Sequence, residues 1–334
     1  MTDVVALAAE LLAIESTTGR EGRAVEFASR WLVSRGWNVT VQEVSPGRGN
    51  VWASRGLGAV TLSTHLDTVP PYIPPTLAGD QHAGTLRGRG ASDAKGIAAA
   101  MLVAADQLVQ SGEERVDLLF VIGEEKGSDG ARAANHLPAT SAFLVNGEPT
   151  ESKLASGCKG SQRVMVRIRG REAHSAYPHL GQSAIEPMLD LLRQLRPIDW
   201  PRDPVLGDTT YNVGVLHAGT EANVVPGFAE AEVMFRLVGD PEPVRALIEE
   251  WAEGKAEIEW GSFIPAQRFH VIPGFDVVPV AYTSDIPLLS RWGTPLLFGP
   301  GSIHVAHTTE EQVSVAELRA SVDAYVRIVR ALLA

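Results

Sequence analysis

The feature that most constrains this chain is a short apolar run that ends abruptly on a histidine or a carboxylate. Such runs lead into His65, Glu124 and Glu148. Short β-branched runs bounded by turn residues predict buried strands. Ligands bind beyond the carboxyl ends of the strands in an open α/β sheet. The sequence therefore predicts several strands that deliver metal-binding side chains to one edge of a sheet.

The length and charge of the chain limit its class. At 334 residues it is long enough for two domains, since about 100–200 residues per domain is usual. A net charge of −11 argues against nucleic acid and anionic membranes as partners. We find no apolar run near the ~18 residues of a membrane span, and no basic-then-apolar N-terminus. With Cys158 as the single cysteine, no internal disulfide forms, and a cytoplasmic location is expected.

Helices and strands are expected to alternate in the first half of the chain. Thr18 and Glu21 have the spacing of a capping box for the second helix. A Pro-rich loop, residues 70–75, follows the strand that ends at His65. The expected helices cover residues 4–14, 21–34 and 95–109, and the expected strands cover residues 37–41, 50–54 and 116–122.

The pattern changes near residue 160. Strands are expected at 163–169, 211–216, 229–237 and 256–260, with helices at 183–195 and 241–252. This β-α-β-β-α-β order predicts a ferredoxin-like insert. The fold class is therefore α/β: a doubly wound mixed sheet with an inserted α+β lid or dimerisation domain. The expected domains are residues 1–159 plus 263–334, which form the catalytic part, and the insert 160–262. A last helix, 314–333, begins with a second capping box, Ser314 and Glu317.

Five side chains form a candidate metal site. A zinc ion takes about four N or O ligands at about 2 Å, and two zinc ions about 3.5–4 Å apart need a bridging group. Any one of these residues alone is more typical of an exposed turn, but together, each at the end of a buried strand, they predict a dinuclear site. Asp67 lies two residues after His65 and is placed to accept its free imidazole N–H. The candidate ligands are His65, Asp93, Glu125, Glu148 and His307.

Glu124 and Glu125 are adjacent carboxylates, which in isolation usually mark a solvated turn. Beside two metal ions they can divide the work. Glu125 would then bind metal, and Glu124 would take a proton from water whose pKa the metal has lowered from 15.7 toward about 7.

Five motifs in order resemble the dinuclear-zinc amidohydrolase and exopeptidase family, which includes acetylornithine deacetylase, succinyl-diaminopimelate desuccinylase, aminoacylase and carboxypeptidase G. The resemblance covers nearly the whole chain. It is strongest to acetylornithine deacetylase and its acyl-lysine-processing relatives. The motifs are His65-Leu66-Asp67, Gly88–Gly96, Glu124–Ser128, Gly147–Thr150 and Gly299–His307.

The resemblance implies how the metals are held. His65 and Glu148 would bind one zinc, Glu125 and His307 the other, and Asp93 would bridge them. Co²⁺ or Mn²⁺ can substitute for zinc.

His304 competes with His307 as the last ligand, but the family places a glutamate four residues after its ligand, and Glu311 follows His307 at that distance. Members of the family also commonly carry a cis peptide after the bridging aspartate, here Asp93–Ala94.

The resemblance also assigns roles outside the metal ligands. Glu124 would be the general base and Asp67 the residue that orients His65. His174 would reach the active site of a partner subunit and stabilise the oxyanion. Substrate contacts are assigned to Asn223, Arg236 and Gly301, with Arg236 holding a substrate carboxylate. A surface loop for His174 and a strand-end salt bridge for Arg236 remain the plainer alternatives.

These observations predict a zinc-dependent hydrolase that cleaves the amide bond of an N-acylated amino acid, such as acetylornithine or acetyl-lysine, with a metal-bridged water as nucleophile. A di- or carboxypeptidase is the alternative within the class, and a non-catalytic amino-acid or metal-binding protein is the alternative outside it. A homodimer is expected, formed by edge-to-edge pairing of the strand Arg163–Arg169 with its symmetry mate.

Overall fold

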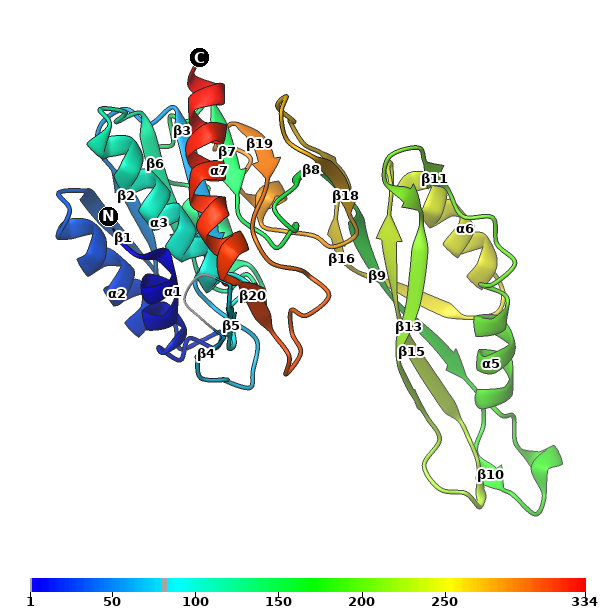
Figure 1. The fold of residues 1–334 in the computed structure, drawn as a ribbon. Coiled ribbons are helices and arrows are strands. Elements are labelled where there is room, and N and C mark those ends of the chain that lie inside the picture. Colours follow the sequence, from blue (N-terminus) through cyan, green and yellow to red (C-terminus); the bar gives the residue numbers. More distant parts are fainter. Residues whose placement is uncertain (1, 80–82) are drawn as a thin grey trace. The chain divides into compact units, whose positions relative to one another are not determined.

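The computed structural model describes residues 2–79 and 83–334 (Figure 1). The chain forms two compact units. Unit 1 contains the chain up to Ser156, together with Phe269–Val278 and Ser284–Ala334. Unit 2 contains Gly157–Arg268 and Pro279–Thr283. Within the described residues, no helix is long and apolar enough to cross a membrane.

The main sheet of unit 1 is mixed, and its described strands follow the order β1-β2-β6-β3-β7-β19. Pairing is antiparallel from β1 to β6 and parallel from β6 through β3 and β7 to β19. The carboxyl ends of four neighbouring strands therefore meet at one edge. The strands are β1 (Asn38–Ser45), β2 (Arg48–Ser54), β3 (Val60–His65), β6 (Val116–Val121), β7 (Phe143–Asn146) and β19 (Thr294–Leu297).

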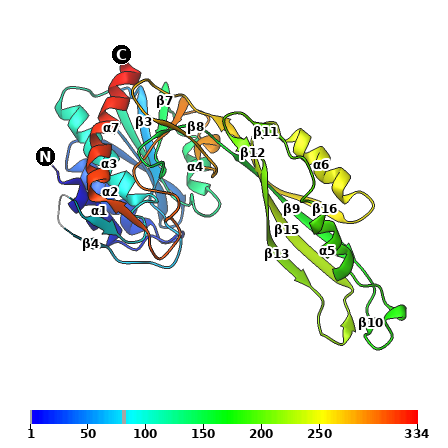
Figure 2. The same ribbon diagram turned by 45° about the vertical axis from the view of Figure 1, so that its right-hand side comes forward.

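Helices α1, α3 and α7 pack against one another, and α3 and α7 also contact β3 of the sheet (Figure 2). α2 packs against β1 and β2, and α4 against β1, β2 and β6. The mixed α/β fold that the sequence predicts is confirmed. The helices of unit 1 are α1 (Val4–Leu12), α2 (Gly22–Val33), α3 (Lys95–Gln110), α4 (Asp129–Ala134), the 3-10 turn η2 (Ile286–Leu288) and α7 (Val315–Leu333).

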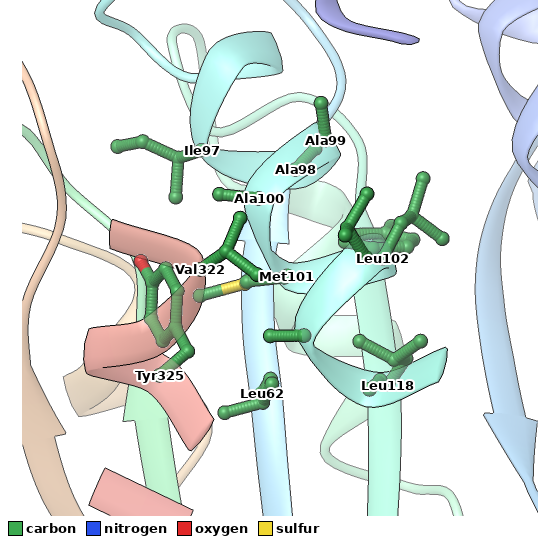
Figure 3. Close-up of a cluster of buried hydrophobic side chains, with 14 of the residues drawn as sticks. Leu62, Ile97, Ala98, Ala99, Ala100, Met101, Leu102, Leu118, Val322 and Tyr325 are labelled. Carbon is green, nitrogen blue, oxygen red and sulfur yellow. The ribbon is translucent and has the colours of Figure 1, made fainter. Parts of the chain in front are cut away.

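The core of unit 1 is built around α3. Nearly every residue from Lys95 to Ala105 is buried, as expected of a helix that is apolar on all sides. Figure 3 shows Met101 of α3 beside Val322 and Tyr325 of α7. Burying one such large side chain contributes about 1.5–3 kcal/mol. Because α3 starts directly after Asp93, its packing also fixes the position of that carboxylate.

Of the two predicted capping boxes, one is absent and the other forms only through its serine. Helix α2 has no side-chain cap, and the Thr18 hydroxyl donates to Asp67 Oδ2 at 2.8 Å instead. At α7, Ser314 caps the helix by accepting from the main-chain N–H of Glu317. The Glu317 carboxylate turns away from the cap and accepts from the N–H of Gly301 at 3.0 Å. The Thr18–Glu21 capping box is therefore wrong: Glu21 itself is the N-cap residue of α2, and Thr18 lies before the helix with its hydroxyl directed to the buried Asp67.

Unit 2 has the predicted ferredoxin-like architecture, with strand order β13-β15-β9-β16, all antiparallel, and two helices. Buried apolar residues of α5 and α6 pack on alternate residues of β9 and β15. The elements are β9 (Gly160–Arg169), α5 (Ile185–Arg193), β13 (Thr210–Ala218), β15 (Phe228–Leu237), α6 (Glu242–Ala252) and β16 (Glu257–Ile264).

The predicted edge pairing of Arg163–Arg169 is wrong. This segment lies in β9, which is hydrogen-bonded to β15 on one side and to β16 on the other. Its main-chain groups therefore have no free edge to offer a second copy. Alternation of apolar residues predicts which face of a strand is buried, but it carries no information on strand order.

Shorter elements complete the chain. In unit 1, β20 (Gln312–Ser314), β5 (Thr85–Arg87) and β4 (Thr76–Ala78) form a small sheet in that order. In unit 2, β10 (Ala173–His174) pairs with β14 (Val224–Val225), and β11 (Arg202–Asp203) pairs with β12 (Gly207–Asp208). The remaining elements are β8 (Leu154–Cys158), η1 (Pro178–Leu180), β17 (Gln267–Arg268) and β18 (Val277–Val280).

Asp117 generates a prediction about stability. Burial raises the pKa of this carboxyl, which accepts from Trp52 Nε1 at 3.3 Å, to about 6. The folded protein favours the protonated form of this carboxyl. The stability that protonation provides is therefore lost as pH rises through 6. Asp117→Asn should therefore raise the free energy of unfolding by about 1–3 kcal/mol above pH 6, and by progressively less between pH 6 and pH 4.

Denaturant titrations across this pH range check the prediction, with the exposed Asp323→Asn as a matched control. A gain for Asp117→Asn that does not change with pH would contradict the electrostatic explanation.

Candidate metal centre

Three parallel strands and one helix position the site. His65 is the last residue of β3 and pairs with Val121 of β6. On its other side, β3 pairs with β7. Glu124 and Glu125 follow β6 in a turn, and Glu148 follows β7. The predicted convergence at one sheet edge is therefore present in the fold.

Asp93 lies between two imidazoles. Its Oδ1 is 3.0 Å from His65 Nε2, and its Oδ2 is 3.3 Å from His307 Nε2. Each oxygen of one carboxylate thus faces a different histidine, which is the arrangement a bridging ligand needs. These contacts lower the pKa of Asp93 against the opposing effect of burial. The peptide between Asp93 and Ala94 is cis, which confirms that expectation.

Glu125 and His307 form the second side of the cluster. Glu125 Oε2 is 2.9 Å from His307 Nε2, while its buried Oε1 has no hydrogen-bond partner within the described residues. Hydrogen bonds to Asp93 and Glu125 raise the pKa of His307 to about 10. His304 makes no such contact within the described residues, and the cluster of metal-type side chains formed by His65, Asp93 and Glu125 contains neither His304 nor His307.

The donor set fits a metal ion. Ligand atoms of His65, Asp93 and Glu125 all lie within 4.8 Å of one another. Imidazole nitrogen with carboxylate oxygen is the mixture found in zinc sites. An orphaned buried oxygen such as Glu125 Oε1 is costly unless a cation or a donor satisfies it.

Asp67 is buried and links three segments. Its carboxylate accepts from the main-chain N–H groups of Glu124 at 3.0 Å and Glu125 at 3.2 Å, and from the Thr18 hydroxyl. His65 Nδ1 is 3.0 Å from the main-chain oxygen of Asp67 and 3.5 Å from Oδ1. Asp67 therefore positions the two glutamates and also leaves His65 Nε2 facing Asp93.

Glu311 holds the backbone around Asp93. Its Oε1 accepts from the N–H groups of Gly90 at 2.9 Å, Ser92 at 3.2 Å and Asp93 at 3.1 Å. Its Oε2 accepts from Arg89 Nη1 at 2.6 Å, and both side chains are almost fully buried. Because Glu311 lies four residues after His307, one buried carboxylate fixes two segments of the site.

The comparisons with known proteins decide the family. The model of peptidase family M20/M25/M40 matches residues 61–331. This chain belongs to that family. An M20 domain-containing protein of Schizosaccharomyces pombe is 38% identical over 98% of this chain and 84% of its own length. A probable carboxypeptidase of Aspergillus flavus is 37% identical over 97% of this chain and 86% of its own.

Solved structures of low identity share the fold of this M20 family member. A tripeptidase of Staphylococcus aureus superposes with a TM-score of 0.83 at 20% identity, covering 99% of this chain and 98% of that one. An M20 metallo-carboxypeptidase of Sulfolobus solfataricus has a TM-score of 0.77 at 16% identity, with 99% of both chains covered. A dinuclear metal-binding M20 peptidase of Bacillus subtilis has a TM-score of 0.72 at 16% identity, covering 99% and 97%.

Membership of the M20 family makes the chain a hydrolase of a metal-dependent family, and the five candidate ligands all lie in the matched region. The expected family and enzyme class are therefore confirmed.

The structure of this M20 hydrolase adds a buried carboxylate that the sequence analysis missed. Burial raises the pKa of Asp285 to about 7. Burial, together with the charge of Asp285, raises the pKa of Glu124 well above its usual value. Burial and the charge of Glu124 do the same for Glu148. In the sequence, Asp285 is marked only by its position directly before the apolar run Ile286–Leu289, and nothing there links it to Glu124.

The other predicted site residues of the M20 hydrolase fall into two groups. In unit 2, β10 pairs with β14, so His174 pairs with Val224, and the N–H of Ser175 donates to the carbonyl of Asn223. His174 and Asn223 are thereby brought together. In unit 1, the Gly301 N–H donates to Glu317 Oε1 at 3.0 Å.

Arg236 lies at the end of β15 and is partly buried. Burial lowers the pKa of its guanidinium, and the positive charge of Arg163 adds to that effect.

Proposed function

We propose that this M20 hydrolase cleaves the amide bond of an N-acylated amino acid whose α-carboxylate is free. Two zinc ions would be held by the candidate ligands, with Asp93 as the bridge between its two facing histidines. Cobalt or manganese are the substitutes that the same ligands would accept. Zinc bound there would supply Lewis-acid polarisation of the scissile carbonyl and a lower pKa for an attacking water.

Glu124 is the proposed general base. Asp67 holds its main chain, and burial together with the charge of Asp285 raises the pKa of the carboxyl well above its usual value, which makes it a stronger proton acceptor. Glu124 would take the proton of the attacking water and return it to the leaving amine.

His174 is the proposed oxyanion donor. Its Nδ1 accepts from the main-chain N–H of Ala176 at 3.1 Å, so in the neutral ring the proton resides on Nε2. The exposed ring can therefore present an N–H to a developing negative charge on the carbonyl oxygen.

The observation that carries the choice of substrate is Arg236. Its partly buried guanidinium makes no hydrogen bond or ion pair with another residue of the described chain, so the plainer strand-end salt bridge has no support there. A desolvated guanidinium is suited to bidentate binding of a carboxylate. We therefore assign it to the substrate α-carboxylate. Asn223 lies beside His174, near the opposite end of β15 from Arg236, so its contact with substrate would come from the partner subunit together with His174.

A carboxypeptidase is the second candidate, since several relatives are named as probable carboxypeptidases. Both activities cut beside an amino acid with a free carboxylate and differ only in the acyl side. Rates of the zinc-loaded protein on acetyl, succinyl and dipeptide derivatives of the same amino acids separate them. Absence of hydrolysis in all three series, with metal bound, would instead favour a binding protein.

The adjacent glutamates should separate into two roles. Glu124→Gln should retain metal binding and lose nearly all turnover, because only the proton acceptor is removed. Glu125→Gln should lose metal affinity, because Glu125 Oε2 faces His307 and Oε1 is unsatisfied. Calorimetric zinc titration and turnover on both variants test this. Near-normal turnover by Glu124→Gln would reject its assignment.

Arg236→Ala should cost roughly 2–5 kcal/mol of transition-state binding for acyl-amino acids and very little for their amides. The reason is that only the free carboxylate can pair with the guanidinium. The ratio of kcat/KM for each acid and its amide measures the effect. An equal loss on both substrates would make Arg236 structural.

A homodimer in which His174 acts on the neighbouring subunit is also proposed. In the described sheet of unit 2, the edge strands are β13 and β16. One of these, instead of β9, would pair with its counterpart in the second subunit. Mixing His174→Ala with Glu124→Gln protein should restore activity in one of the two mixed sites. Mixing Glu124→Gln with Glu125→Gln is the matched control, because both changes lie in one site and cannot complement. No restoration after proven subunit exchange would contradict the cross-subunit role.

A further inference from the structure

A pocket of about 510 Å³ lies beside the metal centre within unit 1. Glu125, one of the clustered candidate ligands, lies in its wall, so the pocket borders the centre at this residue. Small-molecule sites typically occupy about 300–1,000 Å³. The pocket is therefore large enough for one side of a small substrate.

Two further segments line the pocket beside Glu125 and Lys126. Val69, Pro70, Pro71 and Tyr72 supply an apolar part, and the Tyr72 hydroxyl donates to the carbonyl of Ala13 at 3.1 Å. The other part comes from Glu15, Thr17, Thr18 and Arg20. Their segment is held to the residues after His65 by main-chain bonds from Thr18 to Thr68 and from Thr68 to Ser16. The walls are thus fixed by the same segment that carries His65 and Asp67.

Some charged side chains in the pocket have an ion-pair partner within the described chain and one does not. Arg20 Nη1 pairs with Glu15 Oε1 at 3.0 Å, and Glu125 pairs with His307. Lys126 is exposed, and its ammonium makes no ion pair with any residue of the described chain. One free cation therefore stands in a pocket whose other charges are paired.

We propose that this pocket binds the acyl side of the substrate and favours an acyl group that carries a free carboxylate at its far end. The proposal rests on the proposed function, which assigns the carboxylate of the amine side to Arg236 and leaves the acyl side for unit 1. Lys126 directly follows Glu125, and both residues line this pocket. In the proposed complex the acyl carbonyl would lie at the metal centre, the methylene groups against Val69 and Tyr72, and the terminal carboxylate at the ammonium.

The experiment compares three derivatives of one amino acid: N-glutaryl, N-(4-carbamoylbutanoyl) and N-pentanoyl. The chain lengths match, and only the terminal charge and polarity differ. For the metal-loaded wild type we expect the glutaryl compound to have the highest kcat/KM. Lys126→Ala should lower the ratio of glutaryl to carbamoyl kcat/KM about two- to fivefold, the range of an exposed ion pair, and Lys126→Glu should lower it further.

Two controls make the outcome specific. Lys126→Arg should keep the preference because the charge remains, and Lys255→Ala should leave the ratio unchanged, since Lys255 lies in unit 2 on Gln194. A ratio that Lys126→Ala and Lys126→Glu both leave unchanged overturns the subsite. No hydrolysis of any compound by metal-loaded wild type would instead overturn the proposed function, so the two failures are distinguishable.

Discussion

The buried carboxylate of Glu311 is the contact on which the centre depends. It accepts three main-chain N–H groups from the segment that carries Asp93, and pairs with Arg89. A carboxylate withdrawn from water needs several such donors to offset its desolvation. Glu311 therefore holds the loop in a single conformation, which lets Asp93 present one oxygen to each of two histidines.

The second constraint is the excess of buried acid. Asp67, Asp93 and Glu148 are nearly inaccessible, and Glu124 and Glu125 lie beside them, while the described contacts of these carboxylates include two imidazoles, His65 and His307. Burial, together with the charges of the neighbouring carboxylates, raises the pKa values of Glu124 and Glu148. Divalent cations are the natural counter-charge, and family membership in M20 agrees with that requirement.

Much of this arrangement could be predicted because it depends on local patterns. Apolar runs that stop at His65 and near Glu124 define parallel strands, and the breaker-free segment after Asp93 defines α3. The predictions that failed concern features that depend on contacts between residues far apart in the sequence. Thr18 bonds Asp67 instead of its own helix, and β9 is central because strand order depends on long-range pairing. Asp285 escaped notice since only the fold places it near Glu124.

The central claim is that Asp93 bridges two metal ions. Anomalous diffraction from crystals of the zinc-loaded protein, recorded on both sides of the zinc absorption edge, tests it most directly. We expect two peaks per chain, one between Asp93 and His65 and the other between Asp93 and His307, with Glu311 unmoved. A single peak shared by both histidines, or peaks that leave Asp93 without a metal contact, would show that Asp93 is not the bridge.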